Sequence, residues 1–192
     1  MKGIALVVAV CAALAAGCAS TPPPRFYTLS VEAPQTASAQ GPSISVAAVT
    51  VPDTVDRPQL VVAVNANEVS ILEQHRWAEP LKGELGRVLA ENLSRATGNP
   101  RIAAYPQSAS LNADYRVLVD VQRFAGRPDG EVVLDVLWSV RAKDRTLVRR
   151  GRSSAREPVG KGYPALIVAY SLALATLADE LATALKSLPP AK

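Results

Sequence analysis

The chain has 192 residues, and its 21 Lys and Arg against 17 Asp and Glu give a formal charge of +4. This excess of positive charge is too small to indicate nucleic-acid binding. Hydrophobic residues make up 48% of the sequence and aromatic residues only 5%, which predicts a core built from aliphatic side chains rather than large rings.

The first 18 residues have the layout of a bacterial lipoprotein signal. A single early cation, Lys2, precedes a short apolar run over residues 4–16, which is too short to span a bilayer. The run closes on Leu14-Ala15-Ala16-Gly17-Cys18, with leucine one position earlier than is usual. We therefore expect residues 1–17 to be removed and Cys18 to carry diacylglycerol and N-acyl (palmitate) chains. The alternative is an ordinary signal peptide followed by a free thiol.

Cysteine usage limits the chemistry of the mature protein. The sequence has two cysteines, Cys11 in the discarded segment and Cys18 at the lipid. No thiol then remains for a disulfide, a zinc site or a catalytic nucleophile. The mature chain is long enough for one domain, so we expect its fold to depend on packing alone.

A short tether connects the anchor to the domain. Pro22-Pro23-Pro24 favours an extended, stiff segment. Residues 18–24 therefore read as a lipid-anchored tether, with a periplasmic domain over residues 25–192. A chain of this length reaches at most about 25 Å when extended, so we expect the domain to lie near the membrane.

The pattern of apolar residues predicts strands and helices in alternation. Strands are expected at 26–31 and 43–51, at 59–64 and 68–72 as a hairpin turning at 65–67, at 102–105, and at 115–124, 131–141 and 146–153. Helices are expected at 81–97, beginning at Pro80 and ending before Gly98, and at 164–188. The second is nearly long enough to span a membrane, but its charged residues Asp179, Glu180 and Lys186 favour a helix packed on the sheet. The order predicts a single α/β domain with a mixed, largely antiparallel sheet packed by two main helices.

Four short motifs carry a resemblance to a known family. They are Tyr27-Thr28-Leu29, Asp56-Arg57-Pro58-Gln59, Arg76-Trp77-Ala78-Glu79-Pro80-Leu81 and, more weakly, Asp114-Tyr115. In order and spacing they resemble the auxiliary lipoproteins of ABC-type envelope transport, the PqiC (YmbA) family. The likeness covers nearly the whole mature chain, although the final helix matches only in character.

The resemblance implies an outer-membrane-anchored periplasmic subunit that works with MCE-domain proteins moving lipids between the two membranes. It also implies a fold similar to the N-terminal domain of TolB and a role in membrane integrity. Ala19 follows the lipidated residue, and only an aspartate there favours the inner membrane, so outer-membrane delivery is expected. The expected partners are the MCE protein and the outer membrane, with phospholipid as a further candidate. A tip subunit could assemble as a ring, but nothing in the sequence periodicity requires it.

The middle motifs contain the first candidates for partner binding. Arg57, between Asp56 and Pro58, could present its guanidinium to a carboxylate or a phospholipid head group, or it could form an internal salt bridge that fixes the loop. Arg76 and Trp77 are of the types enriched where partners bind. Trp77 could equally fix the entry into the helix at Leu81, and because Pro80 fixes the geometry there, this structural role is favoured.

A basic cluster near the end of the chain gives the second set of candidates. Its members are Lys143, Arg145, Arg149, Arg150, Arg152 and Arg156. The cluster, with Arg149 and Arg150 at its centre, could meet anionic lipid head groups or an acidic rim on a partner. The alternative is a solvated strand face whose arginines prevent aggregation.

The sequence gives no positive reason to expect catalysis, a metal or a cofactor other than the lipid. His75 is the only histidine, and it lies next to Arg76 in an expected loop, without a hydrolase signature around any serine. A binding subunit of a transport system is therefore the leading hypothesis. The rivals are a general outer-membrane lipoprotein that binds peptidoglycan or a Tol-type partner in envelope assembly or secretion and, last, an envelope hydrolase.

Overall fold

The computed structural model describes residues 22–38 and 40–188. The strands are β1 (Arg25–Tyr27), β2 (Ile44–Thr50), β3 (Gln59–Asn65), β4 (Glu68–Trp77), β5 (Ile102–Ala104), β6 (Tyr115–Gly126), β7 (Glu131–Ala142) and β8 (Leu147–Pro158). The helices are α2 (Leu81–Thr97), the 3-10 turn η1 (Ser108–Ser110) and α3 (Gly162–Lys186). The predicted mixed α/β domain with two main helices is confirmed, and β8 runs further than the strand expected at 146–153.

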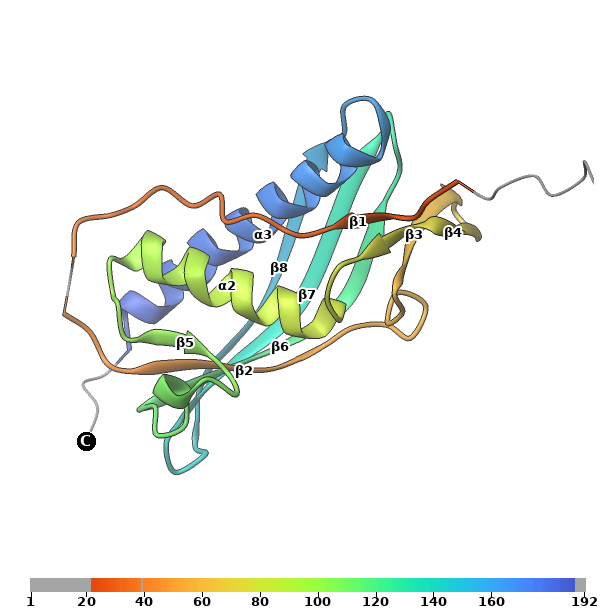
Figure 1. Cartoon of the computed structure of the whole chain (residues 1–192). Coiled ribbons are helices and arrows are strands. Elements are labelled where there is room, and N and C mark those ends of the chain that lie inside the picture. The colour runs from red at the N-terminus through yellow and green to blue at the C-terminus, as the bar shows by residue number, and fades with distance from the viewer. Residues whose placement is uncertain (1–21, 39, 189–192) are drawn as a thin grey trace, which may run out of the picture.

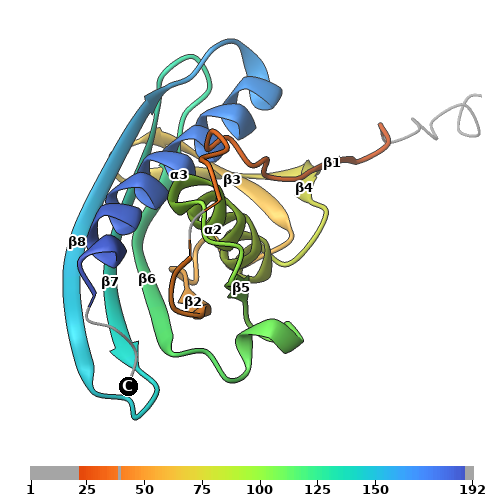
Figure 2. The same cartoon turned by 90° about the vertical axis from the view of Figure 1, so that its left-hand side faces the viewer.

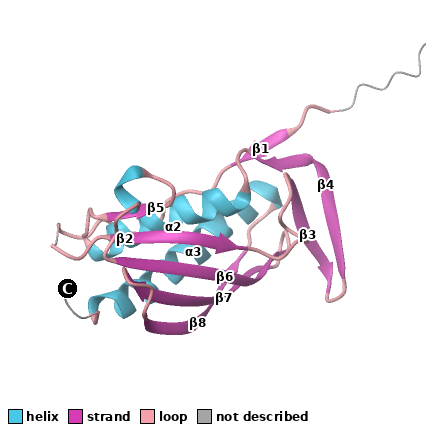
Figure 3. Cartoon of the chain, turned by 90° about the horizontal axis from the view of Figure 1, so that it is seen from below, coloured by secondary structure: helices cyan, strands magenta, loops and turns pink. Residues whose placement is uncertain are grey.

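The strands form two sheets rather than one. The larger has the order β5-β2-β6-β7-β8, parallel from β5 to β6 and antiparallel from β6 to β8. It curves around the two helices, which lie together on its concave face (Figure 2). The opposite face carries no helix (Figure 3). Alternation along each strand follows this arrangement: Val132, Leu134 and Val136 of β7 point to the helices and are buried.

The long helix α3 is the central element of the core. It has the length and hydropathy of a membrane-spanning segment, yet two thirds of its most apolar window is buried inside the domain. Its stripe of leucines and alanines packs against β7, β8 and α2. The expectation of a helix packed on the sheet is confirmed. Its aliphatic stripe is apolar because it is buried against other parts of the protein.

The smaller sheet has the order β1-β4-β3, with β3 and β4 forming the predicted hairpin. The hairpin stands at one end of the larger sheet, where β3 contacts the end of β6 (Figure 3). Strand β4 continues past residue 72 as far as Trp77, because β1 adds to it in parallel and pairs Arg25 with His75 and Tyr27 with Trp77. The prediction that His75 and Arg76 lie in a loop is therefore wrong.

Residues 28–38 form an extended strap that crosses the two helices (Figure 1). The strand predicted at 26–31 is wrong beyond Tyr27, because the strap bonds to side chains instead of a neighbouring strand. Glu84 of α2 accepts a hydrogen bond from the amide of Leu29 at 2.6 Å, and Ser171 of α3 accepts one from Ser30 at 3.0 Å. Asn92 accepts bonds from the amides of residues 32 and 33. The strap thus ties the entry of the chain to both helices.

Candidate functional site

The loop before β3 and the link between β4 and α2 enclose a pocket of about 290 Å³, which we call the loop pocket. It is lined by Asp56, Arg57, Pro58, Trp77, Ala78, Glu79, Pro80 and Leu81. Two backbone hydrogen bonds set its shape: Trp77 donates to the carbonyl of Pro58 at 2.7 Å, and Ala78 donates to that of Tyr27 at 2.9 Å. The structure therefore brings three of the predicted motifs together in one place.

The acidic residues around the loop pocket have charged partners, whereas its arginine does not. Asp56 bonds to Lys82 at 2.6 Å, and Glu79 lies 3.9 Å from Arg87. Arg57, in contrast, has no carboxylate partner among the described residues, and its Nε is buried without a hydrogen-bond partner. The salt bridge expected inside this loop thus forms between Asp56 and α2, and the guanidinium of Arg57 is left available.

Trp77 forms the floor of the loop pocket and belongs to the core. Its side chain is only 5% exposed. The indole meets Phe124 and Tyr170 edge-on, with ring centroids 6.1 and 6.3 Å away, and these two rings stack on each other at 4.1 Å. The burial favours the structural role over that of a protruding anchor, because an anchor must reach a partner.

Arg76, the neighbour of Trp77, does not line the loop pocket. Strand alternation sends its side chain to the other face of β4. There its Nε donates to the carbonyl of Glu73 at 3.0 Å, and its guanidinium lies 3.8 Å from the carboxylate of the same residue. Arg76 is thus held by a local contact on an exposed strand.

The two central arginines of the basic cluster have different surroundings. Arg149 pairs with Val140, which is buried under the helices, and donates to the carbonyl of Ala184 at 3.1 Å and to the hydroxyl of Ser187. It therefore closes the C-terminal end of α3, where the helix dipole favours a cation. Arg150 pairs with Ser139 on the face that carries no helix, and its side chain is exposed.

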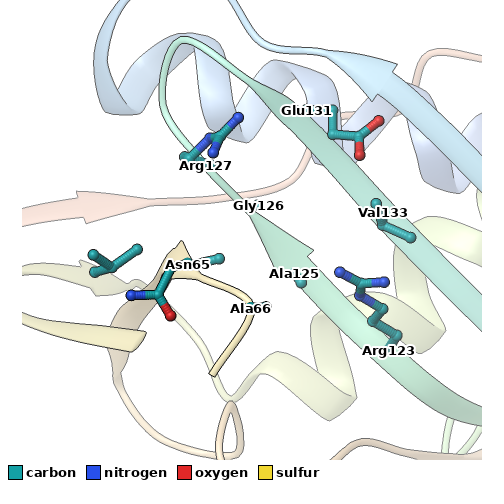
Figure 4. A pocket seen from close by; sticks show the side chains of 10 residues that line it. Asn65, Ala66, Arg123, Ala125, Gly126, Arg127, Glu131 and Val133 are labelled. Carbon is teal, nitrogen blue, oxygen red and sulfur yellow. The ribbon is translucent and has the colours of Figure 1, made fainter. Parts of the chain in front are cut away.

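A second hollow, of about 200 Å³, lies between the tip of the β3–β4 hairpin and the end of β6 (Figure 4). Arg123, Arg127 and Glu131 stand at its edge, over a floor that includes Ala125. Glu131 is engaged by Arg156 at 3.3 Å. Arg123 and Arg127 are not among the residues that the sequence motifs indicated. The only local signal was that they flank the end of a strand, and the hairpin that completes the hollow is distant in sequence.

His75 lies where three elements meet: β4, β1 and the start of α3. Its Nδ1 shares a hydrogen bond of 2.7 Å with the hydroxyl of Tyr27, and its ring lies 4.2 Å from that of Tyr163 at the start of α3. Partial burial and the neighbouring charge of Arg25 lower the pKa of His75. A neutral imidazole is thus favoured at this junction.

Comparison with known proteins places the chain in a family. The family described as the ABC-type transport auxiliary lipoprotein component matches residues 27–182. The chain belongs to this family. The match begins at the last residue of β1 and includes the strap, the loop pocket and most of α3. No curated protein matches the chain.

Two solved structures have a similar fold. One is described only as an uncharacterized protein; it is 21% identical, with a TM-score of 0.69 over 85% of this chain and 99% of that one. The other is protein XCC0632 from Xanthomonas campestris, of the DUF330 family, which is 18% identical, with a TM-score of 0.70 over 84% and 95% of the two chains. At these identities the likeness shows the fold alone.

The predicted lipid attachment lies outside the described residues. Cys18, the signal at 1–17 and the first part of the tether all precede residue 22, the first residue that the structure describes. Family membership supports a lipoprotein, and the residue that carries the lipid stays a prediction.

Proposed function

We propose that this protein is an outer-membrane-anchored periplasmic lipoprotein subunit of a trans-envelope MCE/ABC-type lipid transport system. It docks to the MCE protein and supports membrane integrity. The observation that carries the proposal is the family match over residues 27–182, which makes the chain an auxiliary component of ABC-type transport.

The architecture supports an adaptor that works close to its anchor. The chain enters at β1, which pairs with β4, and continues as a strap fixed on α2 and α3. The loop pocket lies at the same end, since Ala78 bonds directly to the carbonyl of Tyr27. A tether reaching at most about 25 Å then holds this end near the membrane surface.

Crosslinking in the native host tests the docking role. Mild crosslinking followed by purification of the chain should recover an MCE-domain protein, and loss of the chain should make cells more sensitive to detergent. Repeated absence of the MCE protein would count against the proposal. Recovery of cell-wall fragments in its place would favour a general envelope-assembly lipoprotein.

The anchor is tested on the processed protein. Mass spectrometry should find a mature chain beginning at Cys18 with a diacylglycerol thioether and an N-acyl group. Cys18→Ser should release the protein from the outer-membrane fraction. An unacylated sulfur in the native protein would refute the anchoring.

We assign no catalytic role to the chain. The only histidine, His75, is engaged by Tyr27 and Tyr163 at a junction of strands and helix. His75→Ala, expressed at the native level, should leave membrane integrity at neutral pH unchanged. Loss of function in a variant that still folds and docks would reopen the case for an enzyme.

A further inference from the structure

We propose that the loop pocket binds an apolar segment of a partner protein through a free carboxylate, and that Arg57 donates the hydrogen bonds that hold it. The carboxylate is an acidic side chain or a C-terminus. The assignment of the partner as the transport subunit rests on the proposed function, whereas the chemistry of the pocket does not.

The pairing of charges determines the sign of the ligand. Both acidic residues that line the pocket already have cations, Lys82 for Asp56 and Arg87 for Glu79. The lining cation, Arg57, has no acidic partner among the residues described, and its Nε is buried without a hydrogen-bond partner. A buried donor without an acceptor is costly, so an incoming carboxylate gains the hydrogen bond that the protein itself does not provide.

The size and lining of the pocket determine the class of ligand. Besides Arg57 and the two paired carboxylates, the lining is apolar and includes Pro58, Trp77, Pro80 and Leu81. A volume of about 290 Å³ holds one or two side chains beside a carboxylate, and the two long acyl chains of a phospholipid do not fit. An apolar peptide segment with a carboxylate therefore fits better than a lipid.

The pocket is also rigid on the side that a ligand would contact. Trp77 is buried in the aromatic cluster, and the hydrogen bonds from Trp77 to Pro58 and from Ala78 to Tyr27 fix both walls. A ligand entering here orders few side chains other than that of Arg57, which lowers the entropic cost of binding.

The test uses the mature lipoprotein in lipid nanodiscs and a defined probe, N-acetyl-Leu-Leu with a free carboxylate. Its C-terminal amide is the matched control. In proton–nitrogen NMR spectra, titration with the free acid should shift the signals of the Trp77 indole and of the Ala78 and Leu81 amides, and these shifts should reach a plateau. The amide should bind about tenfold or more weakly, because it lacks the charge that strengthens the hydrogen bonds of Arg57.

Three variants separate the role of Arg57 from general stability. Arg57→Gln should abolish the preference for the acid, and Arg57→Lys should keep only part of it, because an ammonium lacks the planar fork. Lys82→Gln should also weaken acid binding, because it leaves Asp56 unpaired beside the guanidinium. Arg76→Gln is the matched control outside the pocket and should bind as the native protein does.

Two results would overturn the proposal: equal binding of acid and amide, or no shift at a saturating probe concentration. Binding of dihexanoyl-phosphatidylglycerol without binding of the peptide would assign the pocket to a lipid head group and overturn it as well. If the probe binds but no MCE protein is crosslinked, the proposed function fails and the pocket stands. If the MCE protein binds Arg57→Gln normally, docking occurs elsewhere and the pocket's assignment as the docking site fails.

Discussion

At the scale of single residues, the core of this domain contains a polar group whose burial costs desolvation free energy. Tyr170 stacks on Phe124 in the core, yet its hydroxyl is buried without a hydrogen-bond partner. Burial raises the pKa of Tyr170, so the phenol stays neutral across the physiological range. The ring contributes packing, while the hydroxyl contributes a desolvation cost.

Tyr170→Phe should therefore stabilise the protein. Removing a buried hydroxyl that lacks a partner should raise the free energy of unfolding by roughly 1 kcal/mol. Urea unfolding monitored by tryptophan fluorescence measures the change, and Tyr163→Phe provides a comparison at a partly buried tyrosine. A clear loss of stability in Tyr170→Phe would show that the hydroxyl has a partner in solution.

The stability of the protein should depend on pH through His75. Because the pKa of His75 is lower in the folded state than its ordinary value of 6.5, the unfolded chain binds more protons between these two pKa values. The contribution of His75 to stability is then complete above pH 6.5 and is lost as the pH falls through the folded-state pKa. Unfolding of the native protein and of His75→Gln should differ in slope over this window, and parallel curves would contradict the prediction.

At the scale of elements, the adjacent residues Arg149 and Arg150 of β8 lie on opposite faces of the sheet and make different contacts. Arg149 bonds to the last turn of α3, whereas Arg150 lies on the uncovered face of the sheet. Strand alternation thus divides the basic cluster: Arg150, Arg152 and Arg156 lie on the uncovered face, whereas Lys143 and Arg145 lie in the turn between β7 and β8. Arg156 on that face is already engaged by Glu131.

Arg149→Ala should destabilise the protein, because the carbonyl of Ala184 in the last turn of α3 loses its charged donor and keeps only the Ser187 hydroxyl, and the matched Arg150→Ala should not. The expected cost for Arg149 is about 1 kcal/mol in the free energy of unfolding. The expected effect of Arg150→Ala is within about 0.5 kcal/mol, as for other exposed substitutions. Chemical denaturation of both variants decides between them, and equal effects would show that Arg149 does not hold the helix end.

At the scale of the whole molecule, the strap connects the entry of the chain at β1 to the core. Glu84, which has no exposed surface, receives the amide of Leu29, and Asn92 and Ser171 hold the following residues. Burial raises the pKa of Glu84 more than its hydrogen bond from Leu29 and the nearby Arg87 lower it. The strap thus depends on a carboxyl that pays a desolvation cost when ionised.

Two substitutions at Glu84 separate the hydrogen bond from the charge. Glu84→Ala leaves the Leu29 amide without an acceptor and should cost about 1–3 kcal/mol, with faster hydrogen exchange along residues 28–36. Glu84→Gln keeps an acceptor and removes the titration. In the native protein the contribution of Glu84 falls as the pH rises from 4.5 through the raised pKa, so Glu84→Gln should remove this fall. Unchanged pH profiles would contradict the assignment.

The sequence by itself determined the class of most elements and the family. The spacing of Leu81, Leu85 and Leu89 identified α2 with its correct ends, because helical periodicity and the Gly98 stop are local signals. The aliphatic composition likewise predicted the core. The motifs around Arg57 and Trp77 were long enough to indicate the family that the comparison then showed.

Only the tertiary structure decided how these pieces act together. The sequence could not show that Asp56 pairs with Lys82 rather than with Arg57, or that Arg149 reaches the end of α3. It also missed the strap, since residues 28–31 have the composition of a strand but bond to helix side chains. The physical reason is that local patterns encode periodicity, whereas the choice of partner depends on which distant surfaces the packed core brings within hydrogen-bond reach.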